Sequence, residues 1–386
     1  MEQFALDSGP FAENPYPIFA RLRREAPVFW HEGLEAWLLT RYEDCRKLNE
    51  DGVNFFPSYD GNPPIPYVQQ LSGDPHRRIR KMMNPAFTPR ALMDTVEPAL
   101  APTAESLLAP FLPTGRIEIA NDYGEPMATR VVSKLLNVAR EDEPWMVKTA
   151  DDLLEAEANP TNQALQAVYP KNLADLRAFF AARLDEERKA PSDTLISQMV
   201  AAAELNEEEL LANTMGMVVA GIETTKRLIS NLIYLLVTHP EQLQMVRDDP
   251  TLLKPAIEET LRIHSPNQPI MRYAQTDVEF GGIAMPRGTR IYGLRGAANR
   301  DPDVWPDPDR FDVTRFLERG LPPHLAFGVG PHICVGAYLA RRETAVATEI
   351  LLKHATNIRL DPDHEVRFVN FRNRGPKELH LLFDAA

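Results

Sequence analysis

Residues 324–342 read HLAFGVGPHICVGAYLARR, a glycine-rich loop that presents one cysteine and then continues as a helix. Cys334 stands at the junction of loop and helix. A thiolate there faces the positive end of the helix dipole, which lowers a thiol pKa and suits either a nucleophile or a metal ligand. Gly328, Gly330 and Gly336 permit positive φ and a close approach of the backbone to a flat or bulky group. Taken alone, Cys334 is better explained as a cysteine buried in a turn of the core.

The complete loop pattern is far more specific than its cysteine. Taken together, its fixed positions resemble the haem-binding loop of the cytochrome P450 family of haem-thiolate monooxygenases; they are Phe327, Gly328, Gly330, His332, Cys334 and Gly336. The resemblance implies haem b (iron protoporphyrin IX) with Cys334 as the axial iron ligand and Phe327, Gly328, His332 and Gly336 around the cofactor. Thiolate ligation pushes electron density onto iron and favours O–O cleavage. Zinc would need more ligands than the close pair of His332 and Cys334 offers, and covalent haem would need a Cys-x-x-Cys-His motif that the sequence lacks.

A second motif lies in the helical segment NTMGMVVAGIETTKRLISNLIYLL, residues 213–236. Gly221 weakens this helix, and a carboxylate and a hydroxyl, Glu223 and Thr224, follow it in an apolar stretch. By themselves they fit a solvent-facing Glu and a Thr bonded back to its own helix. The resemblance implies instead an oxygen-activating helix, in which Glu223 and Thr224 relay protons, Thr225 supports them, and Ala220 and Gly221 border the haem.

Glu259 and Arg262 are three residues apart, which places an acid and a base on one helical face. Such a pair is common, and when exposed it contributes only about 0–1 kcal/mol. Here it precedes a loop rich in Pro and Asp, residues 299–311. The resemblance implies a buried structural network of Glu259, Arg262 and an arginine after them, namely Arg310, with Arg315 as the rival.

His76 and Arg80 are spaced to share one face of a helix that begins near residue 73. The resemblance implies that they hold the haem propionates together with Arg272 and His332. The substrate is expected above the haem. Its expected contacts are Tyr67, Val219 and Ile270, with Pro269 and Ile270 forming a turn.

Between Pro75 and Met93 there are five Lys or Arg residues and no acid, in a chain of net charge −13. Together with Arg341 and Arg342, this basic segment is expected to attract an acidic electron donor, a ferredoxin or flavodoxin. Because no reductase-like segment follows the last predicted strands, we expect electrons to come from separate proteins.

Composition excludes several classes of protein. The 386 residues are 44% hydrophobic and 25% charged, as in ordinary globular chains. The negative net charge disfavours nucleic acid and anionic membranes as partners. The N-terminus lacks the apolar region of a signal peptide, and the uncharged run 320–340 is broken by prolines, so we expect a cytoplasmic protein without a membrane span. Two cysteines indicate a reducing compartment, although a Cys45–Cys334 disulfide remains an alternative.

The expected fold is a mostly α single domain over residues 1–386 with small β-sheets and the haem between the oxygen-activating helix and the cysteine-loop helix. Helices are predicted at 91–110, 125–138, 142–156, 172–189, 193–203, 207–238, 241–248 and 251–263, and strands at 27–30, 36–40, 277–280, 283–285, 289–293, 365–370 and 379–383. The resemblance implies a monooxygenase that inserts one oxygen atom from O2 into an apolar small organic substrate. A peroxide-driven haem-thiolate enzyme and a non-catalytic haem sensor are the alternatives.

Overall fold

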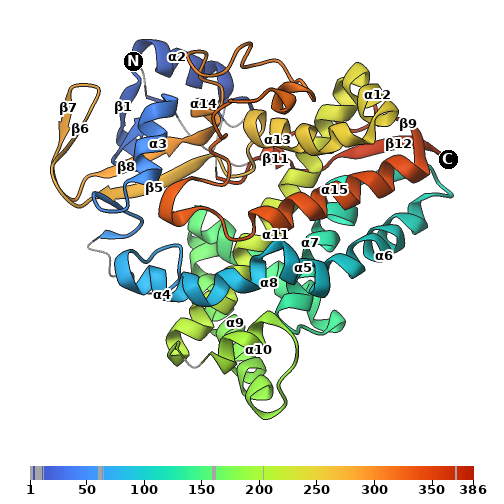
Figure 1. Cartoon of the computed structure of the whole chain (residues 1–386), viewed down its shortest axis with the longest axis horizontal. Coiled ribbons are helices and arrows are strands. Elements are labelled where there is room, and N and C mark those ends of the chain that lie inside the picture. The colour runs from blue at the N-terminus through green and yellow to red at the C-terminus, as the bar shows by residue number, and fades with distance from the viewer. Residues whose placement is uncertain are drawn as a thin grey trace.

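Helices form the body of the molecule, and the two larger of its small sheets lie at opposite ends of it (Figure 1). The computed structural model describes residues 3–4, 11, 13–59, 63, 65–158, 162–202, 204–369 and 372–386. The helices are α2 (Tyr16–Glu25), α3 (Tyr42–Glu50), α4 (Gly73–Met83), α5 (Pro89–Thr95), α6 (Glu97–Leu108), α7 (Glu125–Leu135), α8 (Glu143–Ala158), α9 (Gln163–Lys189), α10 (Leu195–Ala201), α11 (Glu207–Thr238), α12 (Pro240–Asp248), α13 (Leu253–Ile263), α14 (Arg295–Ala298) and α15 (Ala337–His354).

The larger sheet has the strand order β1-β2-β8-β5-β3, in which only β2 and β8 run parallel. A three-stranded sheet of order β4-β12-β9 lies near the C-terminus, and β6-β7 and β10-β11 are two-stranded. The strands are β1 (Val28–His31), β2 (Ala36–Leu39), β3 (Phe55–Phe56), β4 (Arg116–Glu118), β5 (Pro269–Ala274), β6 (Val278–Phe280), β7 (Ile283–Met285), β8 (Arg290–Leu294), β9 (Ala355–Leu360), β10 (Phe368–Val369), β11 (Gly375–Pro376) and β12 (His380–Ala385).

Helix α11 runs through the centre of the molecule and packs against α7 and α15 (Figure 1). It begins with a capping box in which Asn206 accepts from the N–H of Glu209 and the Glu209 carboxylate accepts in return. It ends at Thr238, shortly before Pro240, because proline cannot continue a helix. Its apolar residues enter three separate core clusters, which fixes it as the axis of the fold.

Most predicted helices are present, with instructive differences. The helix predicted at 91–110 is two helices, α5 and α6, because Pro98 fits the first turn of a new helix. The turn predicted at Pro269 and Ile270 is the start of strand β5, where a first-position proline costs no ladder hydrogen bond. Helices α2 and α3 were not predicted. The segment 299–311 is an irregular loop, as predicted.

Residue 370 of the strand predicted at 365–370, residue 203 of the helix predicted at 193–203, and the N-terminal residues 1–2, 5–10 and 12 lie outside the described residues. Among the helices that the structure does describe, none is both long enough and apolar enough to cross a membrane.

Candidate active site

Cys334 has a free thiol that is accessible to solvent although protein atoms surround it. Burial raises the pKa of this thiol, and a hydrogen bond from the N–H of Gly336 and the charge of Arg295 lower it in part. The sequence predicted that the helix dipole lowers the pKa of Cys334. In the structure the effect of desolvation on this pKa is larger, so the pKa is raised instead. An accessible side chain among desolvating neighbours is typical of a residue that faces into a binding site. Cys45 is also free and fully buried, so the structure contains no Cys45–Cys334 disulfide.

Two glycines shape the loop before Cys334. Gly328 and Gly330 have φ of 70° and 75°, which L side chains adopt only with strain. A Cβ on Gly330 would also lie 2.7 Å from Cα of Glu50 in α3. The close approach at Gly330 is therefore to another helix of the protein. Gly336 has φ of −82°, so it does not use the positive φ that glycine permits.

Two histidines and two arginines meet beside the cysteine loop. The rings of His76 and His332 are in contact, with their centroids 4.1 Å apart and their planes tilted by 39°. Burial and the charge of Arg80 lower the pKa of His76 to about 4, and burial and the charge of Arg272 lower that of His332 to about 3. Within the described part of the chain, no acid forms an ion pair with Arg80 or Arg272. We call these four residues the cationic cradle, because its two arginines carry positive charge and its two neutral histidines offer N–H donors; a cluster of this kind without an acid fits an anionic ligand.

One face of α11 is half-exposed although the helix lies at the centre of the molecule (Figure 1). It includes Gly216, Val219 and Ala220, whose spacing of three and four residues places them in one stripe. Most other residues of the helix are buried. The stripe therefore borders a space that protein side chains do not fill.

The two proposed relay residues, Glu223 and Thr224, are not bonded to one another; each has a different partner. The Thr224 hydroxyl donates to the carbonyl of Ala220 at 2.6 Å, which is the back-bonded arrangement considered above. Glu223 is not solvent-facing, because its side chain is only 13% exposed and accepts from Nε of Arg227 at 2.7 Å. Lys226 Nζ lies 3.9 Å from the same carboxylate. Sequence reasoning missed Arg227, although its position four residues after Glu223 was a usable signal.

Gly221 has a packing role that the sequence did not reveal. A Cβ at this position would lie 2.8 Å from Cγ2 of Val132 in α7, which is closer than real carbon atoms approach. Glycine is therefore required for α7 to pack against α11 at this level.

Tyr67 packs against α11. Its hydroxyl donates to the carbonyl of Gly216 at 3.1 Å, and the absence of a side chain on Gly216 leaves room for the ring. Burial raises the pKa of Tyr67, and the charge of Cys334 raises it further. Asn213 fixes this loop by accepting from the N–H of Val68 at 3.0 Å. Asn213 is fully buried and was not singled out from the sequence.

The other two predicted substrate contacts differ from one another. Val219 is half-buried and packs beside the same apolar cluster as Tyr67. Ile270 is buried in a different cluster, with Leu48 under the larger sheet, and it pairs with Gly293 of β8. The placement of Ile270 at the substrate was therefore wrong, because its strand turns this side chain into the core.

Glu259 and Arg262 form the buried pair that was expected. Arg262 donates from Nε and Nη2 to the two carboxylate oxygens of Glu259 at 2.7 Å each, and both side chains are fully buried. The third member is Arg315, whose Nε lies 3.0 Å from Glu259. Arg310 offers only its backbone carbonyl to Arg262, while its side chain is 64% exposed. The choice of Arg310 over Arg315 was therefore wrong.

Acids neutralise several of the cations near the cysteine loop. Arg341 donates to both oxygens of Glu258, at 2.5 and 2.8 Å, and Arg342 donates to Glu97 at 2.8 Å. Arg78 is paired with a buried glutamate of α11. The positive charge of this face is smaller than the sequence count implied.

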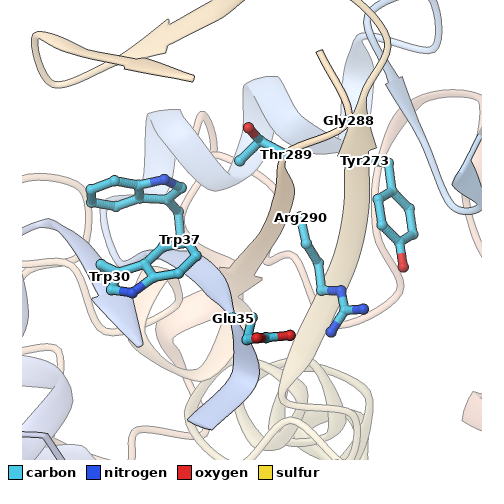
Figure 2. A pocket seen from close by; sticks show the side chains of 7 residues that line it. All are labelled: Trp30, Glu35, Trp37, Tyr273, Gly288, Thr289 and Arg290. Carbon is cyan, nitrogen blue, oxygen red and sulfur yellow. The ribbon is translucent and has the colours of Figure 1, made fainter. Parts of the chain in front are cut away.

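A pocket of about 250 Å³ lies elsewhere, on the larger sheet (Figure 2). Trp30, Trp37, Tyr273 and Arg290 are among its lining residues. Tyr273 follows Arg272 on β5, and successive strand residues point to opposite faces. The pocket contains none of the predicted site residues, and we assign it no role.

Comparison with known proteins decides the family. A family model described as Cytochrome P450 matches residues 114–367. The chain belongs to the cytochrome P450 family. This cytochrome P450 is 35% identical over 369 residues to the vitamin D(3) 25-hydroxylase of Pseudonocardia autotrophica, covering 90% of this chain and 87% of that one.

Solved cytochrome P450 structures share the fold over nearly the whole chain. Myxobacterial CYP267B1 in complex with myristic acid superposes with a TM-score of 0.90 at 30% identity, covering 98% of each chain. P450BioI in complex with an acyl carrier protein ligated to hexadec-9Z-enoic acid gives 0.89 at 30% identity, covering 96% of this chain and 99% of that chain. The expected fold, mostly helical with small sheets, is confirmed.

The cytochrome P450 family uses a haem-thiolate cofactor, and the residues of this chain fit it. Cys334 offers one accessible thiol, and within the described residues no group of three or more His, Cys, Asp or Glu side chains forms a separate metal site. The cationic cradle matches the two negative charges of the propionates. The half-exposed stripe of α11 lies beside Tyr67. The protein is a cytochrome P450 monooxygenase, an oxidoreductase.

Proposed function

We propose that this cytochrome P450 acts as one domain and inserts one oxygen atom from O2 into an apolar small-molecule substrate. The observation that carries the proposal is the half-exposed stripe of α11, against which Tyr67 packs. In the overall reaction a C–H bond becomes C–OH. The second oxygen atom leaves as water, which uses two protons and two electrons.

The haem supplies oxygen activation when bound, and the protein holds it. We assign Cys334 as the iron ligand and His76, Arg80, Arg272 and His332 as donors to the propionates. Buried guanidinium groups make strong, geometrically defined hydrogen bonds to carboxylates. Formation of these bonds relieves the desolvation of four groups that have no acidic partner in the described chain.

We assign proton delivery to Glu223 and Thr224. Once the Thr224 hydroxyl has broken its hydrogen bond to the Ala220 carbonyl, this hydroxyl can donate to an oxygen atom of the substrate complex. Glu223 can re-supply it only after releasing Arg227. The ion pair between Glu223 and Arg227 therefore gates the transfer, and the buried position of the pair keeps bulk water away from the oxygen.

For the substrate, we propose a long-chain fatty acid or another extended apolar compound. The stripe of α11 and Tyr67 border an apolar cluster that includes Val219 and Ile222. The bound ligands of the two compared structures, myristic acid and a carrier-linked hexadecenoic acid, support this class.

For electrons, we propose a separate acidic ferredoxin or flavodoxin. Because Arg341 and Arg342 are paired with acids, the exposed Lys81 and Arg90 are the better docking cations. Complementary charge of this kind raises the association rate at low salt.

The test combines spectroscopy with turnover. We expect the dithionite-reduced protein with carbon monoxide to show the strongly red-shifted Soret band of thiolate-ligated haem, and Cys334→Ala to lose it. Titration with myristic acid should shift the spin state, and NADH, a surrogate ferredoxin and its reductase should yield a hydroxylated product. Product formation with hydrogen peroxide alone would instead indicate the peroxide-driven alternative. If the haem-loaded protein makes no product under either condition, with fatty acids or with vitamin D(3), the non-catalytic haem sensor is the remaining alternative.

A further inference from the structure

Arg295 is a buried cation at the haem site that neither the sequence nor the assigned roles explain. It begins α14 directly after β8, and β8 pairs with β5, the strand that carries Arg272. Its Nη2 lies 3.4 Å from the position that a Cβ on Gly328 would occupy. The guanidinium therefore touches the start of the cysteine loop.

The charge of Arg295 acts on Arg272 on one side of the site and on Cys334 on the other. It lowers the pKa of Arg272 in addition to burial, and Cys334 in turn partly offsets the lowering of the Arg295 pKa by burial. Arg295 thus lies among Arg272, Gly328 and Cys334. By surface area Arg295 is half-buried and Cys334 is exposed, although protein atoms surround both side chains. This similarity places Arg295 beside the same unfilled space.

The hydrogen bonding of Arg295 is incomplete. Nη1 donates to Oδ1 of Asn267 at 2.7 Å, but Nε is buried and has no hydrogen-bond partner among the described residues. No described acid forms an ion pair with Arg295 or with Arg272. A buried guanidinium with a free N–H beside a second guanidinium is costly unless an anion lies near both.

We propose that Arg295 is a third haem-anchoring cation beside Arg80 and Arg272, and that its Nε–H donates to the haem carboxylate that Arg272 also binds. This inference rests on the proposed role of the cationic cradle. A bound carboxylate would satisfy the free Nε–H and separate the two like charges. The fixed positive charge near Cys334 also stabilises the additional electron of reduced iron, which raises the reduction potential.

The test uses haem-loaded protein and three variants. Arg295→Leu removes charge and donor, Arg295→Gln keeps a donor, and Arg295→Lys keeps the charge. Arg319→Gln, at an exposed arginine of the loop 318–320, is the matched control. The readouts are the rate of haem transfer to apomyoglobin, the resonance Raman bending bands of the haem carboxylates, and the reduction potential.

We expect Arg295→Leu to accelerate haem loss at least about tenfold, because hydrogen bonds to charged groups are the strong ones. It should also shift a carboxylate bending band and make the potential more negative. Arg295→Lys should recover most of the potential, which a merely structural role would not predict. Arg319→Gln should match the wild type.

Arg272→Gln separates this inference from the cradle on which it rests. If Arg272→Gln accelerates haem loss while every Arg295 variant keeps the wild-type bands and potential, Arg295 does not bind the carboxylate and the inference is overturned. If neither position affects haem retention or the bands, the cradle assignment itself fails. Should Arg295→Leu not fold, Arg295→Gln and Arg295→Lys decide the question with the same readouts.

Discussion

Nε of Arg227 lies 2.7 Å from Oε1 of Glu223, one turn earlier on α11, and holds the carboxylate as an ion pair. Thr224, the next residue, donates instead to the carbonyl of Ala220. The acid and the alcohol assigned to proton delivery are thus adjacent in sequence but bonded elsewhere. Any transfer between them requires the Glu223 carboxylate to exchange Arg227 for a new partner.

Glu223→Gln should slow product formation by about 10²-fold, the usual contribution of a positioned acid or base. The amide still accepts from Arg227 but cannot carry a proton. Product formation and NADH consumption in the reconstituted system measure the effect, and an unchanged carbon monoxide spectrum shows that haem stays bound. Glu208→Gln, at an exposed glutamate in the first turn of the same helix, is the control. Equal rates for both variants would remove Glu223 from the relay.

Thr224→Ala should divert reduced oxygen to hydrogen peroxide while leaving the haem in place. Thr238→Ala is closely matched, because Thr238 makes the same bond to the carbonyl four residues earlier, at 2.8 Å, outside the site. The ratio of product to NADH consumed, together with released peroxide, measures the coupling. We expect the ratio to fall severalfold for Thr224→Ala and to stay at the wild-type value for Thr238→Ala. Retained coupling in Thr224→Ala would contradict the assignment.

Glu259→Gln should destabilise the protein by about 3–5 kcal/mol, because it leaves the buried Arg262 without a full counter-charge. Arg310→Gln should change the free energy of unfolding by less than about 0.5 kcal/mol, since that side chain is 64% exposed. Urea unfolding followed by circular dichroism measures both. A large effect of Arg310→Gln would restore Arg310 to the network in place of Arg315.

The cysteine loop and the central helix were accessible from the sequence because their information is local. Glycines at fixed intervals around Cys334 and a long apolar period ending before Pro240 specify loop and helix without knowledge of their neighbours. The position of Ile270 was not accessible, because a strand presents alternate residues to opposite faces and the sequence does not say which face meets the site.

Contacts between residues that are far apart in the sequence explain the remaining differences between the predictions and the structure. Arg310 and Arg315 lie on the same loop, and only the folded path of that loop decides which guanidinium reaches Glu259. The packing role of Gly221 depends on Val132 of another helix. Arg295 gave no signal, because an arginine after an apolar strand is ordinary until the loop at Gly328 is folded beside it.

Asp151 of α8 gives the last prediction, which concerns pH. Burial, and then the charge of Glu223, raise the Asp151 pKa from 3.8 to about 6. The folded state therefore binds this proton more tightly than the unfolded state, so the carboxyl costs stability progressively as pH rises from about 4 to about 6 and fully above that. Asp151→Asn should stabilise the protein by up to about 3 kcal/mol at pH 8 and by about half as much at pH 5, since one pKa unit is about 1.4 kcal/mol.

Asp152→Asn, which removes an acid paired with Lys148 on the same helix, is the control and should change stability by less than about 1 kcal/mol at either pH. Urea unfolding at the two pH values measures the difference, and a gain for Asp151→Asn that did not grow with pH would show that Asp151 titrates normally.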